Sequence, residues 1–486
     1  MTALPVSFLS TRRGKLTLLL LCFVAFLDFV DASIVNVALP SIRHDLHISV
    51  QNVQWVLSGY LLTYGGFMLL GGRAADLLGR RRVLVAGTAV FAAASLGAGL
   101  AGNETAVVTA RLVQGLGAAL MLPAALSLVT TIFNEGTDRT KALGAWGATA
   151  GVASAAGVFL GGVLTQGPGW RWVFFVNPLI CLGVLAGTFL LIDDERRRAR
   201  LAHFDIVGAV LSTAGMLLLV YAIVQAPTVG WGATSTIAEL AGAVGLLALF
   251  IVNELRTENP LLPLSIFKIK GLGAADATQL IAIAGFLATF FFLTLYMQDV
   301  LDYSPLRTGL SYLPVTAGVI VAAGISSQLF PRIGTRPILV VGALVAAAGI
   351  YYLSRVPIHG SYASDLLPGL VVMSLGLGAV FTGATTAANA GVPPDEAGLA
   401  AALLNASQQL GGALGIAIFT AIATSHTHRL IAAHSPVPEA LAAGFHRALV
   451  AAAAFLVVAA VIALRATNTR GEEAMRTGAV AEPALA

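Results

Sequence analysis

The sequence predicts an all-α integral membrane protein with 14 transmembrane helices, and two observations predict this class. First, 57% of the 486 residues are hydrophobic and only 11% are charged, whereas a soluble chain carries about a quarter charged residues. Second, apolar runs of about 20 residues recur along the chain, which is the length that a helix needs to cross a bilayer. A soluble protein with a large core does not explain this repetition.

The predicted spans are separated by short polar segments. The first run follows Arg12, Arg13 and Lys15 like a secretory signal, but it continues to Pro40, which is too long for the apolar part of a signal peptide. The spans are predicted at residues 16–40, 51–71, 83–102, 106–131, 143–165, 173–192, 206–226, 234–253, 273–298, 308–330, 337–354, 365–391, 398–424 and 445–465.

The placement of lysine and arginine supports this count and predicts an orientation. With the amino terminus inside, 21 of the 28 basic residues fall in inner segments, six fall in outer segments, and Arg111 lies within a span. Basic loops stay preferentially on the cytoplasmic side, so both termini are predicted to be cytoplasmic. These loops also account for the net charge of +4 without nucleic-acid binding.

An internal repeat predicts the domain organisation. The stretch ADLLGRRRVLVAG at 75–87 matches FPRIGTRPILVVG at 330–342, with Gly79 opposite Gly334 and Arg81 opposite Arg336. Chance similarity between apolar segments is the alternative, but both stretches are predicted inner loops leading into a span. We expect a six-helix bundle at 1–200, two inserted helices at 201–258, a second six-helix bundle at 259–466 and a disordered cytoplasmic tail at 467–486.

Two aspartates and an arginine stand out inside the predicted spans. Asp28 and Asp31 are three residues apart in LDFVDASIVNVALP and so share one helix face, and buried carboxylates can hold a proton near neutral pH. Arg111 in span 4 has a depth comparable to that of Asp31, from a rise of about 1.5 Å per residue. We hypothesise that Asp31 and Arg111 face a common cavity, where proton binding switches their attraction. The alternatives are that an aspartate only helps pack span 1, and that Arg111 reaches the outer interface.

Two further motifs have unusual spacing. The segment GRAADLLGRRR between spans 2 and 3 holds Asp76 among arginines, flanked by two glycines. Span 5 contains GVASAAGVFLGG, whose closely spaced glycines let helices pack backbone to backbone. The glycines of this block are Gly151, Gly157, Gly161 and Gly162.

These motifs resemble signatures of the major facilitator superfamily. GRAADLLGRRR is similar to its loop motif, which implies a conformational latch formed by Gly72, Asp76, Gly79 and Arg80. RLVQGLGAA at 111–119 is similar to its span-4 motif, whose arginine is tied to proton transfer. The glycine block resembles the antiporter motif of drug exporters, although Val158 stands where that motif has proline.

Other stretches resemble the 14-span drug/proton antiporter subfamily of the EmrB/QacA type. These are VDASIVNVALP at 30–40, WRWVFFVNP at 170–178 and LLNASQQLGGALG at 403–415, and the resemblance extends from about residue 16 to 465. It implies the major facilitator fold, with two six-helix bundles plus two inserted helices. Asp31 lies within the first signature and is our expected proton carrier. Asp28 lies outside its core and is expected to tune the substrate.

The expected function is a proton-coupled antiporter that exports amphipathic drugs or antibiotics as a monomer in a bacterial inner membrane. A narrow physiological substrate, an uptake symporter and a non-transporting sensor or scaffold are the alternatives. No phosphate-binding loop or other enzymatic motif is evident, and no cofactor or metal is expected, because a solvated loop explains His426, His428 and His434 better. The residues expected to line a substrate cavity, with lipid-facing or interhelical positions as the alternative, are Gln114, Phe290, Tyr296, Asn405 and Gln408.

Overall fold

The computed structural model describes residues 8–133, 137–193, 205–258, 260–393 and 397–469. Within these ranges 14 helices are long and apolar enough to cross a membrane, and no β-strand occurs in them. The predicted all-α architecture and the number of spans are confirmed. Several helices extend beyond the predicted ends; the first runs from Arg12 to Asp45.

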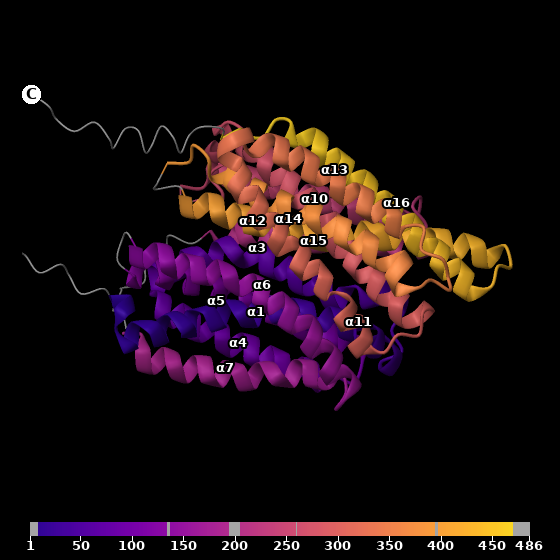
Figure 1. The fold of residues 1–486 in the computed structure, drawn as a ribbon, viewed down its shortest axis with the longest axis horizontal. Helices are drawn as coiled ribbons and strands as arrows, with labels where there is room; N and C mark the ends of the chain where they lie inside the picture. Colours follow the sequence, from indigo (N-terminus) through magenta and orange to yellow (C-terminus); the bar gives the residue numbers. More distant parts are fainter. Residues whose placement is uncertain (1–7, 134–136, 194–204, 259, 394–396, 470–486) are drawn as a thin grey trace, which may run out of the picture. The chain divides into compact units, whose positions relative to one another are not determined.

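Contacts divide the chain into two units. The first contains Met1–Leu261 and Leu293–Leu313, and the second contains Leu262–Phe292 and Pro314–Ala486. We call the side of the membrane where the first helix begins the near side, and the opposite side the far side. The helices up to residue 261 (Figure 1) are α1 (Arg12–Asp45), α2 (Val50–Val53), α3 (Trp55–Leu78), α4 (Arg80–Gly99), α5 (Glu104–Ile132), α6 (Thr137–Gln166), α7 (Arg171–Leu191), α8 (Ile206–Val229) and α9 (Thr234–Arg256).

Polar side chains start several of these helices. The Thr11 hydroxyl accepts a hydrogen bond from the Gly14 amide at the start of α1, and the side chain of Asn103 does the same for α5. Such caps satisfy amides that have no partner within the helix. Large apolar side chains such as Leu182 and Leu190 remain exposed on α7, as expected for helix faces that contact lipid.

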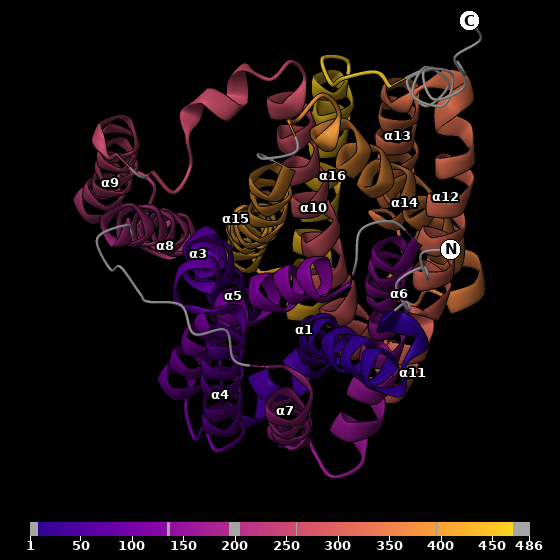
Figure 2. The ribbon, with the colours of Figure 1, turned by 90° about the vertical axis from the view of Figure 1, so that its left-hand side faces the viewer.

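The two inserted helices belong to the first unit by contact. A side chain at Gly66 of α3 would overlap Thr213 of α8, so these helices lie very close. On the other face of α8, Gly215 packs against Leu247 of α9, and Figure 2 shows α8 between α3 and α9. The predicted separate segment 201–258 is therefore packed on the first bundle by way of α3.

The remaining helices are those of the second bundle. Of this part of the chain, residues 293–313 group with the first unit. The elements are η3 (Leu264–Lys268), α10 (Leu272–Leu295), the π-helical turn η4 (Tyr296–Val300), α11 (Pro305–Ser311), α12 (Leu313–Ile333), α13 (Thr335–Leu353), η5 (Tyr362–Leu366), α14 (Leu367–Asn389), α15 (Ala397–Ala432) and α16 (Val437–Ala463).

The structure supports the internal repeat at the backbone level. Gly79 separates α3 from α4 with φ of 101°, and Gly334 separates α12 from α13 with φ of 85°. Residues other than glycine rarely adopt such positive φ angles. Eight residues later in each copy, Gly87 packs closely on α5 and Gly342 packs closely on α14. The two sequence copies therefore build the same turn and the same helix packing.

The predicted tail is packed against the protein in its first residues. The Thr467 carbonyl accepts a hydrogen bond from the Thr335 hydroxyl at 2.7 Å, and the Asn468 side chain accepts one from the Arg336 amide. The prediction of disorder is thus wrong for 467–469, because polar groups of the repeat loop bind them. The rest of the tail (470–486, with Arg470 and Arg476) and the predicted basic loop residues Arg196, Arg197, Arg198 and Arg200 lie outside the described residues.

Candidate functional site

The carboxylate of Asp31 is held by side chains from two other helices. Its Oδ2 accepts a 2.6 Å hydrogen bond from Nη1 of Arg111, and its Oδ1 accepts bonds from the amides of Gln114 at 2.8 Å and Asn177 at 2.7 Å. Asp31 and Arg111 are both fully buried. The sequence hypothesis placed Asp31 and Arg111 at a common cavity, and the structure places them in direct contact as an ion pair.

The guanidinium of Arg111 is fixed by more than its ion pair. Its Nε donates to the Val56 carbonyl at 2.8 Å, its Nη1 also contacts Oε1 of Gln114, and it lies 4.2 Å from the ring centroid of Tyr60. Such stacking over an aromatic face is favourable for arginine. Its Nη2 has no hydrogen-bond partner among the described residues, so one donor remains available beside Asp31.

Asn177 joins α7 to this network, and the sequence reasoning missed it. Besides Asp31, its amide donates to the Ser95 hydroxyl at 3.0 Å, and Ser95 donates to the Phe174 carbonyl. Asn177 is fully buried, and its Oδ1 has no partner among the described residues. An asparagine before proline inside an apolar span was the available signal, since polar side chains at that depth need partners.

Asp28 has different hydrogen-bond partners from Asp31, one turn away, although one of them, Tyr60, also stacks on Arg111. Its Oδ1 accepts a 2.6 Å hydrogen bond from the Tyr60 hydroxyl, and its Oδ2 accepts one from Tyr64 at 3.1 Å. No cation pairs with Asp28 within the described ranges. The tyrosines were also missed, although two phenols four residues apart in one span share a helix face.

The glycine block of α6 brings three helices close together. A Cβ at Gly157 or Gly161 would overlap the backbone or side chains of α1, and one at Gly162 would overlap α11 at Leu306. From the other side, a Cβ at Gly309 of α11 would overlap the carbonyl of Val158. The block therefore works through close packing in this chain even with valine at the motif's proline position. Gly151 lies in the same helix.

The expected latch residues lie at the near-side turn between α3 and α4. Asp76 pairs with Arg80 at 3.4 Å in the exposed turn, and Nε of Arg80 donates to the Ser127 hydroxyl of α5 at 2.6 Å. Gly79 provides the turn itself, and a Cβ at Gly72 would meet Pro123 at an ordinary distance of 3.7 Å. These contacts join three helices of the first unit.

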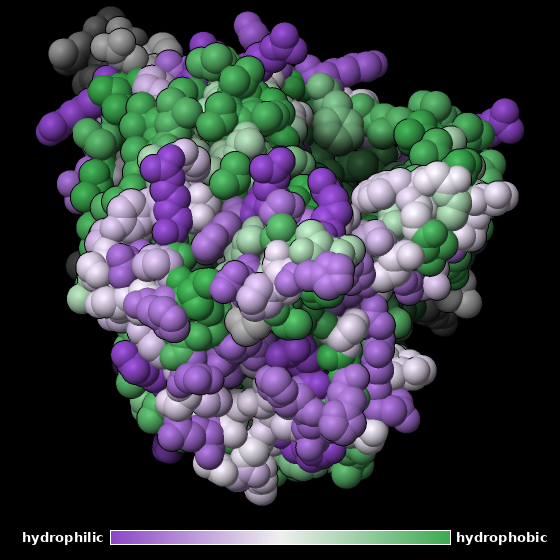
Figure 3. Space-filling view, turned by 90° about the vertical axis from the view of Figure 1, so that its right-hand side faces the viewer, coloured by the Kyte–Doolittle hydropathy of each residue, from purple (hydrophilic) through white to green (hydrophobic). Residues whose placement is uncertain are grey.

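The first half of the segment 293–313 is bound to α1 at the far side. The Thr294 hydroxyl donates to Oδ1 of Asn36 at 2.6 Å and lies 2.9 Å from the Tyr312 hydroxyl. Nearer the surface, Asp299 pairs with Arg43 at 2.8 Å and with His44 at 3.2 Å. Figure 3 looks onto the far-side ends of the helices and shows hydrophilic side chains gathered there.

Comparison with known proteins identifies this arrangement. The family model described as Major Facilitator Superfamily matches residues 21–416. The chain belongs to the major facilitator superfamily. It is 38% identical to the puromycin resistance protein of Streptomyces alboniger, over 92% of this chain and 90% of the relative. It is 36% identical to the cephamycin export protein of Amycolatopsis lactamdurans, over 93% and 92% respectively.

Solved structures agree on the fold. A bacterial homologue of the human lysosomal transporter Spinster, in an inward-facing and unoccupied conformation, superposes with a TM-score of 0.68. It covers 98% of this chain and 100% of that chain at 17% identity. This likeness places the present chain in the same fold of facilitator transporters.

The expected cavity residues of this facilitator fall in different places. Gln114 belongs to the Asp31 network, and Tyr296 is buried in η4 of the first unit. Phe290 belongs to the second unit, where its ring lies 5.5 Å from that of Phe286. In α15 the Asn405 amide donates to the Ala401 carbonyl of its own helix, and Gln408 is partly exposed. Their role as a substrate cavity stays a prediction.

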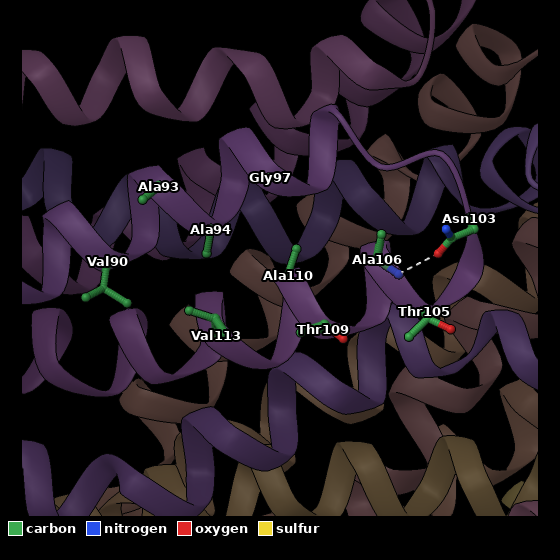
Figure 4. A pocket seen from close by; sticks show the side chains of 10 residues that line it. All are labelled: Val90, Ala93, Ala94, Gly97, Asn103, Thr105, Ala106, Thr109, Ala110 and Val113. Carbon is green, nitrogen blue, oxygen red and sulfur yellow. Dashed lines mark hydrogen bonds between the residues drawn. The ribbon is translucent and has the colours of Figure 1, made fainter.

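A shallow groove of about 780 Å³ lies between α4 and α5 of the facilitator. Figure 4 shows its lining, which is apolar at Val90, Ala94, Ala110 and Val113 and polar at Asn103, Thr105 and Thr109, with Asn103 at the far-side end. It contains no charged side chain and no member of the Asp31 network. The groove is therefore a surface feature of lipid-facing helices and is separate from the buried network.

Two buried polar residues of the second unit were absent from the sequence reasoning. Asp276 and Gln279 stand one turn apart in α10 and are 5% and 1% exposed. A carboxylate inside an apolar span was the signal that should have drawn attention, as it did for Asp28 and Asp31.

The described residues hold no group of three or more potential metal ligands. His426, His428 and His434 therefore do not form one.

Proposed function

We propose that this facilitator is a proton-coupled antiporter that exports amphipathic drugs or antibiotics from a bacterial cell by alternating access. The observation that carries the proposal is the fully buried Asp31–Arg111 ion pair, because ionisable groups at membrane depth are costly and mark ion pathways or binding sites. The relatives named for puromycin resistance and cephamycin export support export as the direction of transport.

Protonation of Asp31 is the proposed coupling step. A proton on Asp31 turns its carboxylate into a neutral acid and removes its ionic attraction to Arg111. Arg111 keeps its bonds to the Val56 carbonyl and its stacking on Tyr60, so its charge stays in place while its partner becomes neutral. Gain and loss of the proton therefore change the attraction between α1 and α5, the two helices that carry the pair.

Asp28 is proposed to tune the substrate. Two phenol hydroxyls satisfy its oxygens, and hydroxyls are easier to displace than a buried ion-paired arginine. A protonated amine of a substrate would gain a charge-assisted bond by replacing them.

The far-side bonds and the near-side turn are the proposed moving contacts. The Asn36–Thr294 and Arg43–Asp299 contacts are the ones proposed to break in each cycle. The turn with Gly72, Asp76, Gly79 and Arg80 is the proposed latch at the other side. From the basic loops we propose that both termini are cytoplasmic, and that the protein works as a monomer in the inner membrane.

The test is drug transport into everted vesicles carrying the protein, with an imposed pH gradient. Puromycin is the first substrate to use, and a protonophore should abolish its uptake. Asp31→Asn should lower pH-driven uptake at least tenfold, while Asp45→Asn should not. Asp45 is the matched control because it lies on the same helix but pairs with Arg171 at the surface. Full pH-driven transport by Asp31→Asn would rule out Asp31 as the proton carrier.

A narrow substrate range is the second candidate. It is favoured by the names of several relatives, each of which gives a single antibiotic, among them the lincomycin resistance protein of Streptomyces lincolnensis, 36% identical over 85% of this chain. A drug-susceptibility panel in a pump-deficient host separates the two. Protection against one structural class indicates a narrow exporter, and protection against several unrelated classes indicates a multidrug exporter.

A further inference from the structure

The polar pair Asp276 and Gln279 in α10 lacks the partners that buried polar groups normally have. Neither carboxylate oxygen of Asp276 and neither amide atom of Gln279 has a hydrogen-bond partner among the described residues. The neighbouring Thr278 does not help, because its hydroxyl donates to the Ala274 carbonyl of its own helix. An ionised carboxylate buried without a partner costs several kcal/mol, so this site is built for a bound species or for a neutral acid.

The helices packed on α10 provide no counter-charge at this depth. Gly411 and Gly415 of α15 pack on Leu280 and Ala284 of α10, which places Ser407 level with Asp276. Between residues 399 and 424 α15 has no charged residue, and the same holds for α16 between 448 and 463 and for α14 between 367 and 389. The cations near this end of α10 include Lys268, Lys270 and Arg465, which are exposed, and the partly buried Arg336, whose Nε donates to the Ala466 carbonyl.

An apolar cluster lies at the near-side end of α10, shortly before the pair in the chain. Ile266, Leu272, Ala400 and Leu403 form its buried core, packed by Leu262, Ile269, Val392 and Leu399. Asp276 follows Leu272 by about 6 Å along the helix, from the rise per residue. The pair therefore lies about one helical turn into α10 from its near-side end, beyond a residue of this apolar cluster.

Gln279 suits a carboxyl group that changes its protonation state. The two side chains are three residues apart and share one helix face. An amide offers an acceptor oxygen and a donor NH₂, so its oxygen can accept from a protonated carboxyl. After rotation of the amide, its NH₂ can donate to the ionised form.

We propose that Asp276, assisted by Gln279, is a second proton-binding site of the transport cycle, in the second bundle and independent of the Asp31 network. The inference rests on the proposed proton-coupled export. In the step, one proton from the far-side water binds a carboxylate oxygen of Asp276, and it leaves to the near-side water when the site ionises. Two carboxyl sites then give two protons for each exported molecule.

The test measures stoichiometry in proteoliposomes with the full-length protein, with the membrane potential clamped at zero and a pH difference of one unit. The puromycin gradient that just stops net flux equals the proton ratio raised to the number of coupled protons, about 100-fold for two protons and about tenfold for one. For the wild type, net puromycin flux should stop at a puromycin gradient of about 100-fold. For Asp276→Asn it should stop at about tenfold, and for Asp276→Glu at about the wild-type gradient. Equal reversal ratios for wild type and Asp276→Asn would overturn the inference.

Failure of the underlying function has a different signature. If the wild-type reversal ratio does not respond to the pH difference, proton coupling itself is absent. A second measurement does not depend on transport: infrared difference spectra between low and high pH should show a protonated-carboxyl band that Asp276→Asn lacks and Asp276→Glu retains. In Gln279→Leu the pH at which this band appears should shift. A protonated-carboxyl region that is identical in wild type and Asp276→Asn contradicts the site even if that variant transports poorly, whereas a remaining band from Asp31 does not.

Discussion

The two membrane-buried carboxylate sites of this protein differ in how completely they are satisfied. Asp31 in the first unit has an arginine and two amides on its oxygens, whereas Asp276 in the second has no hydrogen-bond partner within the described ranges. Asp28, with two phenol donors, lies between these extremes. The comparison teaches that burial alone does not define a role, because buried carboxylates in this protein differ in the partners that their oxygens find.

The largest loss of stability is expected when one partner of the Asp31–Arg111 pair is removed. Arg111→Leu leaves the Asp31 carboxylate buried without its cation, which should lower the free energy of unfolding by about 3–5 kcal/mol. Denaturant titration of the protein in detergent measures this loss in the free energy of unfolding. The double variant Asp31→Asn/Arg111→Leu is the control, because it removes both charges and should recover a large part of the loss. No recovery would mean that packing of the arginine, and not its charge, stabilises the site.

An intermediate loss of stability is expected when a tyrosine that donates to Asp28 is replaced. Tyr60→Phe removes the 2.6 Å donor but keeps the ring that stacks on Arg111, and it should destabilise the protein by about 1–3 kcal/mol. Tyr64→Phe removes the longer bond and is the matched comparison, with about 0.5–1.5 kcal/mol expected. The same unfolding titration ranks them. The reverse order would show that Tyr64 is the main partner of Asp28.

The smallest effect on stability is expected at the unpaired site. Asp276→Asn breaks no hydrogen bond. The free energy of unfolding at neutral pH should therefore fall by less than about 1 kcal/mol, or it should rise. This variant therefore separates stability from coupling, since its stoichiometry is expected to fall while its fold is kept. A loss comparable to that of Arg111→Leu would show that Asp276 is as well paired as Asp31, and the contrast between the sites would disappear.

Much of the fold could be predicted from the sequence because it depends on local properties. The length of apolar runs predicts the spans, and the repeated Gly79 and Gly334 predict matching turns that the structure shows with positive φ. The domain ends were less predictable. Thr467 was assigned to a disordered tail, yet it binds the repeat loop, because a polar segment without periodicity gives no signal of such a contact.

The candidate site could be predicted only in part. The helical spacing of Asp28 and Asp31 placed them on one face, and similar depth suggested Arg111 as a partner. Asn177 was quoted within a motif without a role, and Asp276 was overlooked in an otherwise apolar span. Partners that lie 80 to 146 residues apart in the chain cannot be assigned from spacing within one helix.

The sequence by itself determined that this chain spans a membrane 14 times, repeats a glycine turn and buries charged groups in lipid-depth helices. These are consequences of transfer free energy and helical periodicity, which act along the chain. Only the tertiary structure decided which buried carboxylate is paired. Pairing depends on which faces of α1, α5 and α7 meet, and that packing also leaves Asp276 and Gln279 with no partner on the described helices around them.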